Sequence, residues 1–514
     1  MALSIHLRPI VTAFLVSLSV VLIMQFLLLV HHNVAAMINN AMMALTTPAA
    51  LKESLIVIPA EIFIYGLPYR LSQFLGISVH TAFIWFVFMV VNFSCIISYY
   101  IFNRQYKPDA VACMLFAVAL SGAFFILPLL AHNIYGQREH LQMALLFPYI
   151  LLVWGRFTNA EPSSFKVKIL VGLLGSIALI IKPIVAFIPL ILELMVFLSH
   201  RKIRKLITIE AFLTAGLSAL YMVYWYIAWP GYFDKISDNI ESIGGYSIDT
   251  QKVITALTQY LITAMIILAG SWYGKRYEEQ RVRISVFFAT LVSAAIVIAI
   301  IQQRFFPHHV YAIALCFLFW WVFLARKMPV WSTLLLGVAL YSWSDNKLQN
   351  ALAVDGVLHK MLEETAPDFS EMSGKSMASL GVWIWPFHQV ALYSGAQWSF
   401  PSNNLAYLGT EYKKHDDPTI SDKKVAPLIP LIEYSESSKN QHNQVVSFFH
   451  QSPPDFVILA PLADFTKGRP QIDVIAALTQ DDDFSSVWSN YILHREVVVK
   501  DIFTYRIYKY DNKE

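Results

Sequence analysis

The stretch "HNIYGQREHL", residues 132–141, places Arg138, Glu139 and His140 between two long apolar runs. The planar guanidinium of an arginine matches the oxygens of a phosphate. Glu139 could hold a metal ion, a sugar hydroxyl or Arg138, and His140 could act as an acid or as a hydrogen-bond donor. Helix capping is the alternative interpretation, but an arginine at a helix start opposes the helix dipole.

Two later segments supply groups of the same kind. Lys182 precedes Pro183 in "LIIKPIVAF", and a lone lysine deep in an apolar segment is a functional candidate by default. Arg304, with His308 or His309, could contact a phosphate or a sugar. Adjacent histidines point in different directions on a helix, so these two alone are not expected to form a metal site. A snorkelling lysine and a polar helix end are the structural alternatives.

Glu53 and Glu61 are the only acids between His31 and Ser78. The segment around them is amphipathic, as in a helix that lies in the membrane interface. A partly desolvated carboxylate there could serve as a general base, whereas the alternative is a solvated polar face. A further segment, 230–250, is either a loop that covers the substrate or an ordinary connector. Its acidic residues are Asp234, Asp238, Glu241 and Asp249.

The composition indicates which kind of scaffold positions these residues. The chain has 514 residues, of which 57% are hydrophobic and 14% charged, and its mean hydropathy is +0.53. Because soluble domains carry roughly 25% charged residues, most of this chain is expected to lie in lipid. The net charge of +3 gives no reason to expect a nucleic-acid partner. The three cysteines lie in apolar runs and indicate neither a disulfide framework nor a zinc motif.

Apolar runs long enough to span a bilayer recur along the first two thirds of the chain. The segment 168–200 is too long for one ordinary span, and basic clusters flank it at both ends. Two short helices that meet at Lys182-Pro183 would put both clusters on one side, which gives about eleven transmembrane helices. The other predicted runs are 9–30, 80–102, 110–131, 141–155, 206–229, 254–272, 284–302, 309–325 and 329–344.

The distribution of basic residues predicts the orientation. With the N-terminus inside, the inner segments carry sixteen Lys and Arg and the outer segments seven, as the positive-inside rule requires. We therefore expect a multi-pass protein of the inner, cytoplasmic membrane, whose first span at 9–30 is a retained helix. The predicted domains are a transmembrane domain at 1–344, with an interfacial first outer loop at 31–78, and an extracytoplasmic domain at 345–514.

The predicted C-terminal domain is of the α/β class. "DFVILA" and "FTYRIYKY" are typical of strands, and "QIDVIAALTQ" is typical of a helix. "WIWPFHQVALYSGAQWSF" is rich in aromatic residues, for which core packing is favoured over stacking on a sugar ring.

The chain resembles the GT-C superfamily of polytopic membrane glycosyltransferases, which use polyprenyl-phosphate sugars. The resemblance runs in order through most of the chain, and "GQREH" is its most specific part. The segments that carry it are "YGQREHLQMALLFPYIL" (135–151), "IALIIKPIVAF" (177–187), "PGYF" (230–233), "QQRFFPHH" (302–309) and "FHQVALYSGAQW" (387–398).

This resemblance implies a catalytic acid in the first outer loop, matched here by Glu53 with Glu61 as the alternative. The family most often has Asp there, whereas this loop has only Glu. It also implies a second charged motif, matched by Arg138, Glu139 and His140, and it leaves open a divalent cation, Mg²⁺ or Mn²⁺, although we assign no metal ligands.

The expected function is transfer of a sugar from a polyprenyl-phosphate donor to an extracytoplasmic glycan, lipid or protein. The donor phosphate would contact Arg138 and Lys182, with Arg304 as a further candidate, and Glu139 and His140 would orient the donor head group. Three other functions stay open: a transporter or flippase of a lipid-linked or anionic substrate, a ligase that moves whole oligosaccharides, and a non-catalytic scaffold. Apart from membrane lipids, the expected partners are therefore the lipid-linked sugar and its acceptor.

Overall fold

The computed structural model describes most of the chain in separate stretches. They are residues 2–27, 29–46, 59–130, 134–205, 207–229, 250–272, 279–302, 307–324, 356–381, 387–400, 405, 407–408, 411, 428–459, 472–499 and 503–511. The chain divides into two compact units. The first contains residues 1–28, 84–224 and 247–353, and the second contains residues 29–83, 225–246 and 354–514.

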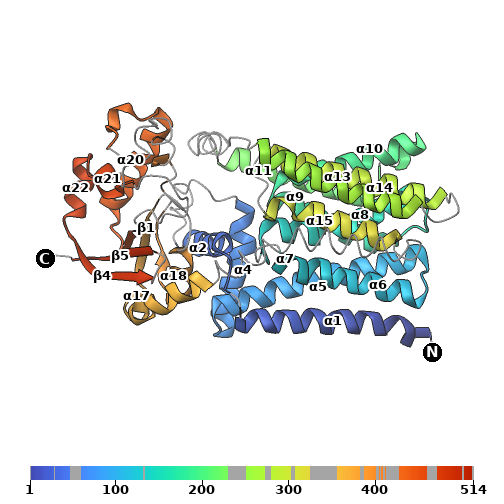
Figure 1. Cartoon of the computed structure of the whole chain (residues 1–514), viewed down its shortest axis with the longest axis horizontal. Coiled ribbons are helices and arrows are strands. Elements are labelled where there is room, and N and C mark those ends of the chain that lie inside the picture. The colour runs from blue at the N-terminus through green and yellow to red at the C-terminus, as the bar shows by residue number, and fades with distance from the viewer. Residues whose placement is uncertain are drawn as a thin grey trace. The chain divides into compact units, whose positions relative to one another are not determined.

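Long helices that run alongside one another build the first unit (Figure 1). They are α1 (Ala2–Leu27), α5 (Val79–Tyr106, from Ile84 onward), α6 (Ala110–Ser121), α7 (Leu127–Leu130), α8 (Arg138–Thr158), α9 (Phe165–Ile181), α10 (Phe187–His200), α11 (Ile209–Ala228, up to Tyr224), α13 (Thr250–Trp272), α14 (Glu279–Ile301) and α15 (Pro307–Leu324). Among the described residues, seven helices are long and apolar enough to cross a membrane. Two shorter apolar helices lie at Val253–Ala269 and His308–Leu324. The chain is a multi-pass membrane protein; the predicted run at 329–344 lies outside the described residues.

Helix α8 is the most buried of these long helices and packs against α9, α10 and α15. It ends where Asn159 adopts the left-handed conformation, with φ of 57°. Such a residue commonly terminates a helix. Rings from neighbouring helices close around α8; the centroids of Phe147 and Phe319 lie 4.2 Å apart.

The break at Lys182 is the one that the sequence predicts. Pro183 has no N–H to donate and disfavours helical backbone in the residue before it. Lys182 is accordingly extended, with φ of −155° and ψ of 98°. A short 3₁₀ turn, η2 (Pro183–Ala186), then leads into α10.

Helices α9 and α10 form a hairpin that returns along α8. Gln142, near the start of α8, donates from Nε2 to the Ala178 carbonyl of α9 at 3.0 Å. His200, at the end of α10, lies 3.2 Å from the Phe157 carbonyl near the end of α8. The basic segments that flank the hairpin therefore lie at one end of the unit, as expected.

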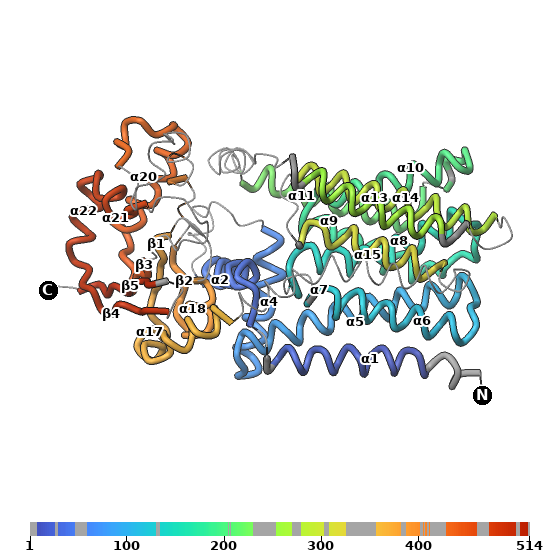
Figure 2. Tube along the Cα trace, viewed as in Figure 1, coloured from blue at the N-terminus to red at the C-terminus, as the bar shows by residue number. Residues whose placement is uncertain are grey.

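The second unit contains a five-stranded mixed sheet with the strand order β2-β1-β3-β5-β4, and Figure 2 follows its trace. β1 (Ser376–Leu380) pairs in parallel with β2 (Gln397–Trp398) and β3 (Phe456–Leu459). β5 (Phe503–Tyr510) is antiparallel to β3 and to β4 (Tyr491–Val499). Its helices are α2 (His32–Thr46), α4 (Pro59–Leu75), α17 (Phe369–Met372), α18 (Phe387–Ser394), α20 (Glu436–Gln451), α21 (Val474–Leu478) and α22 (Asp482–Trp488). β3, β5 and α21 lie in the segments predicted as strands and helix.

The division of the chain differs from the predicted boundary at 344/345, because the described parts of the first outer loop belong to the second unit. Helix α2 packs against α18 and β2. Asn39 donates from Nδ2 to the His388 carbonyl at 2.8 Å. The hydrophobic pattern of 31–78 gives no sign of these partners, which lie some 350 positions away in the chain.

The described part of the aromatic segment packs in the core, which the sequence favoured. Trp398 is 3% exposed, and its indole N–H donates to the Phe400 carbonyl at 2.9 Å. Its ring lies against that of His388, with centroids 3.8 Å apart. Trp383 and Trp385 lie outside the described residues.

Candidate functional site

Four helix ends of the first unit meet around Lys182. They are the start of α8, the end of α9, the end of α14 and the start of α15. Lys182 donates from Nζ to Glu139 Oε1 at 2.5 Å and to Gln302 Oε1 at 2.7 Å. The side chains of Lys182 and Glu139 are only 17% and 9% exposed. A charged pair that is this desolvated is costly to maintain, which marks this end of the bundle as a functional candidate.

The backbone around Lys182 is fixed as well as its side chain. Gln142 donates from Nε2 to the Lys182 carbonyl at 2.8 Å, in addition to its bond to α9. This amide therefore adds a donor to two carbonyl groups beside the break in the helix, and the Lys182 carbonyl also accepts from the Val185 N–H of the 3₁₀ turn at 3.2 Å. Gln142 was not among the predicted site residues, although a lone glutamine in the apolar run 141–155 was a visible signal.

His140 holds the turn that precedes α8. The Gly136 N–H donates to Nδ1 of His140 at 2.9 Å. Nδ1 is thus the acceptor, so Nε2 carries the proton and donates to the Phe124 carbonyl, also at 2.9 Å. Gly136 has φ of 74°, a conformation that glycine adopts without strain.

The expected donor-binding role of His140 does not fit this geometry. The ring is 0% exposed, and backbone groups occupy both of its nitrogens. Its position is that of a residue that orients the loop carrying Arg138 and Glu139. This role could not be predicted from the sequence, because the Phe124 carbonyl comes from a π-helical segment that meets His140 only in the folded chain.

A π-helical turn supplies one of those partners. The segment η1 (Gly122–Ile126) joins α6 to α7. Its Phe124 carbonyl accepts from His140, and its Ala123 carbonyl accepts from the Tyr311 hydroxyl of α15 at 2.8 Å. π-helical turns occur often at functional sites. Here the turn ties the starts of α8 and α15 to the same segment.

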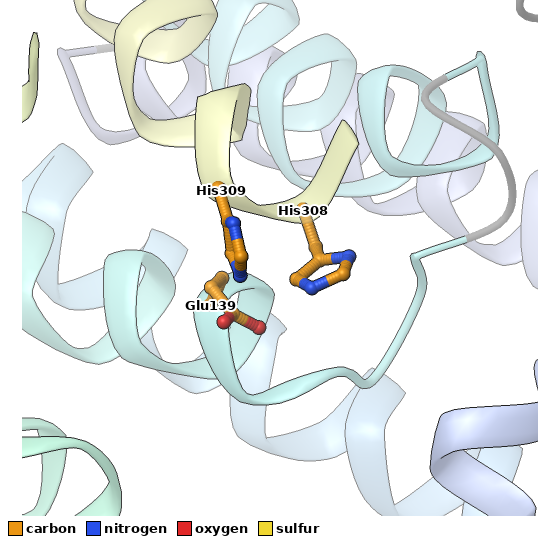
Figure 3. Close-up of side chains that lie close together, drawn as sticks. All are labelled: Glu139, His308 and His309. Carbon is orange, nitrogen blue, oxygen red and sulfur yellow. The ribbon is translucent and has the colours of Figure 1, made fainter. Parts of the chain in front are cut away.

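His308 and His309 begin α15 beside the Glu139 carboxylate (Figure 3). One ligand atom from each of the three residues lies within 4.8 Å of the other two. The two rings are nearly perpendicular, at 74°, with centroids 4.3 Å apart. The two side chains point in different directions from the first turn of α15, as expected for adjacent residues, but Glu139 of α8 lies where both reach it, which the sequence did not predict.

The structure places the other predicted residues as follows. Arg138 is the first residue of α8 and is partly exposed. Glu61 is 4% exposed in the first turn of α4, in the second unit. Glu53, Arg304 and the acids of the 230–250 segment lie outside the described residues.

A second charged cluster lies at the opposite end of α8, and the sequence did not predict it. Arg156 binds both carboxylate oxygens of Glu193, from α10, and donates to the Lys205 carbonyl at 2.6 Å. Glu210 of α11 lies 3.5 Å from Arg156 Nε. Tyr149 donates to Glu193 at 2.5 Å. This cluster fastens the hairpin to α8 about 25 Å from Glu139 along the helix axis.

The arrangement around Lys182 can bind an anion. The ammonium of Lys182 contacts Glu139 in the first turn of α8, and Arg138 is the first residue of that helix. Cations attract a phosphate group, and the low dielectric strengthens the attraction. The carboxylate and the two imidazoles beside them are donors that a divalent cation accepts.

No protein-family model matches the chain, and no curated protein matches it either. Among solved structures, the chain is similar to the cryo-EM structure of the arabinofuranosyltransferase AftD from Mycobacteria. The identity is 13% and the TM-score 0.49, over 98% of this chain and 40% of that one. The chain thus spans about two fifths of the length of that protein.

Proposed function

We propose that the protein transfers a sugar from a polyprenyl-phosphate donor to an acceptor hydroxyl outside the cytoplasm. The observation that carries the proposal is the pairing of Lys182 with Glu139 at the break between α9 and α10. It presents a desolvated cation, beside Arg138, at one end of an apolar bundle. A lipid phosphate with its chain in the bilayer and its sugar in water suits such a position.

In the proposed reaction the acceptor oxygen attacks the anomeric carbon of the donor sugar. The bond between that carbon and the phosphate oxygen breaks, and its electron pair stays on the departing lipid phosphate. Lys182 and Arg138 stabilise the charge that develops there, which is where fixed cations lower a barrier most. Arg304 would add to them. A single displacement of this kind inverts the anomeric centre.

The proton of the acceptor hydroxyl passes to a carboxylate of the first outer loop. Glu53 is the first candidate and Glu61 the second. Glu61 is 4% exposed in the first turn of α4. Glu139 would orient the donor head group.

The role of a carboxylate as the general base is tested with the variants Glu53→Gln and Glu61→Gln, in a strain whose envelope glycans are profiled by mass spectrometry. Loss of one glycan linkage in one of the variants, with membrane expression unchanged, is expected. Unchanged glycans in both variants would remove the base from the proposal. Solute uptake by reconstituted vesicles without any change in glycans would favour a transporter instead.

A further inference from the structure

We propose that Glu139, His308 and His309 form a binding site for one transition-metal dication, such as Zn²⁺ or Mn²⁺. A carboxylate and two imidazoles are a ligand set found in catalytic zinc sites and in open sites of other transition metals. Such sets supply three protein ligands and leave at least one position for water or substrate. Mg²⁺ and Ca²⁺ prefer oxygen ligands, so the two histidines discriminate against them.

Only a small movement of the three side chains is needed to bring their ligand atoms to the spacing found around a metal ion. Tetrahedral zinc with bonds of about 2.0–2.1 Å keeps its ligand atoms roughly 3.3 Å apart. The three ligand atoms lie within 4.8 Å of one another. Figure 3 shows both rings next to the Glu139 carboxylate. Since a terminal imidazole or carboxylate turns about its last torsion at little cost, the ligands can approach without moving the helices.

Lys182 is compatible with this site. A carboxylate has two oxygens and about four lone-pair positions, so the bond from Lys182 to Oε1 leaves room for a metal. Groups that hold a ligating carboxylate in orientation are a usual part of metal sites. Lys182 therefore acts as a positioning residue for Glu139 with respect to the metal.

The charge around the metal indicates which kind of ligand would occupy its open coordination position. A dication bound by Glu139 carries two positive charges against the single negative charge of that carboxylate, which leaves a net positive charge on the metal and its ligands beside the cations Lys182 and Arg138. An anionic oxygen ligand, such as a phosphate monoester, relieves it. That part of the inference rests on the proposed function, whereas the metal site itself does not.

The test measures the metal directly. The full-length protein in nanodiscs is stripped with a chelator, incubated with Zn²⁺, Mn²⁺ or Mg²⁺ separately, desalted and analysed for metal content and thermal stability. About one equivalent of Zn²⁺ or Mn²⁺, a raised Tm, and no retained Mg²⁺ are expected. Co²⁺ substitution should give the absorption spectrum of a site with nitrogen and oxygen ligands.

Three variants locate the site: Glu139→Gln, His308→Asn and His309→Asn each lower the bound metal at least tenfold. The control, His200→Gln, changes a histidine at the far end of α10 and keeps the full equivalent. Metal retained in all three variants, or absent from the wild-type protein, would overturn the site. Folding of each variant is checked by its Tm without metal, and His308→Gln and His309→Gln replace any variant that fails.

The two proposals fail separately. If the wild-type protein binds the metal, the three variants lose it and their glycans are unchanged, the site stands but takes no part in sugar transfer. Absent metal together with loss of transfer in a Lys182 variant would overturn the site and leave the proposed function. Farnesyl phosphate is the probe for the open position, and it should tighten Mn²⁺ binding in the wild-type protein only.

Discussion

Lys182 Nζ lies 2.5 Å from Glu139 Oε1, although 43 positions separate the two residues in the chain. Each residue stands at the end of a different apolar helix, and their side chains are largely buried. Removing one member of such a pair leaves a desolvated charge, whereas removing both does not. This difference allows a structural effect to be separated from a chemical one.

Lys182→Met should lower the rate of sugar transfer by about 10²–10³, the usual effect of losing one group that stabilises developing charge. It should also lower the free energy of unfolding by about 3 kcal/mol, since Glu139 loses its partner. The double variant Lys182→Met/Glu139→Gln should regain most of the stability and none of the activity. Transfer is measured with a radiolabelled donor, and unfolding by tryptophan fluorescence in detergent.

The control for this experiment is Lys166→Met, which removes an exposed lysine near the start of α9. Its activity and stability should match the wild type. Recovery of activity in the double variant would contradict the role given to Lys182, because it would make the lysine no more than a counter-ion.

His140→Phe should destabilise the protein and weaken donor binding only together with that loss of stability, because the ring orients the loop that carries Arg138 and Glu139. Phenylalanine keeps the ring but loses both hydrogen bonds, so the Gly136 N–H and the Phe124 carbonyl are left buried without this partner. An unsatisfied buried group costs about 1–3 kcal/mol, so a loss of at least 2 kcal/mol is expected. Donor affinity is measured by titration with a donor analogue well below the Tm. An unchanged Tm combined with weaker donor binding would return His140 to the expected donor-contacting role.

Arg156→Met should cost about 3–5 kcal/mol of stability, because Glu193 and Glu210 are left together in the bundle without their counter-ion. Neutralising all three residues, with Glu193→Gln and Glu210→Gln added, should recover most of this loss. The matched control is Arg283→Met, which breaks an exposed pair with Glu279 and should cost less than about 1 kcal/mol. A similar loss in both single variants would show that the buried cluster has no special structural role.

Acidification should loosen the second unit at His442. Its ring is 0% exposed, and burial lowers the pKa of His442 below its ordinary value, an effect that Asp481 partly opposes. The unfolded chain then binds a proton at about pH 6.5 while the folded one does not. Stability is fully present above that pH and falls as the pH decreases, by at most about 1.4 kcal/mol per pH unit.

Hydrogen exchange of the α20 peptide, Glu436–Gln451, between pH 7.5 and 5.5 measures this effect, after correction for intrinsic exchange rates. His442→Gln keeps a group that can accept from the Tyr407 hydroxyl, which lies 3.2 Å from Nδ1. In that variant the decrease in protection on acidification should be reduced. Equal pH dependence in both proteins would assign it to another group.

The sequence predicted the features that depend on local chemistry. Pro183 fixes the break at Lys182, and the hydropathy of the long runs fixes most of the long helices. It also singled out Arg138, Glu139, Lys182, His308 and His309, of which the last four come together in the structure. A lone polar residue within an apolar run is easily recognised in the sequence.

The remaining features depend on contacts between distant segments. Nothing near His140 in the chain shows that its ring is held by a glycine amide and a π-helical carbonyl. Likewise, Asn39 and His388 meet only after the second unit has assembled. The convergence of His308 and His309 on one carboxylate depends on where α15 begins relative to α8, which the helical period alone does not determine.

The central claim is that the Lys182 end of the bundle holds the phosphate of a lipid-linked sugar. A cryo-EM structure of the full-length protein in nanodiscs with a non-hydrolysable polyprenyl-phosphonate sugar tests it most directly. The phosphonate is expected within hydrogen-bond distance of Lys182 Nζ, with Arg138 beside it and the lipid chain in the bilayer. A phosphonate bound at the Arg156 end of α8, or a Lys182 that keeps only its present partners while the donor binds elsewhere, would contradict the account.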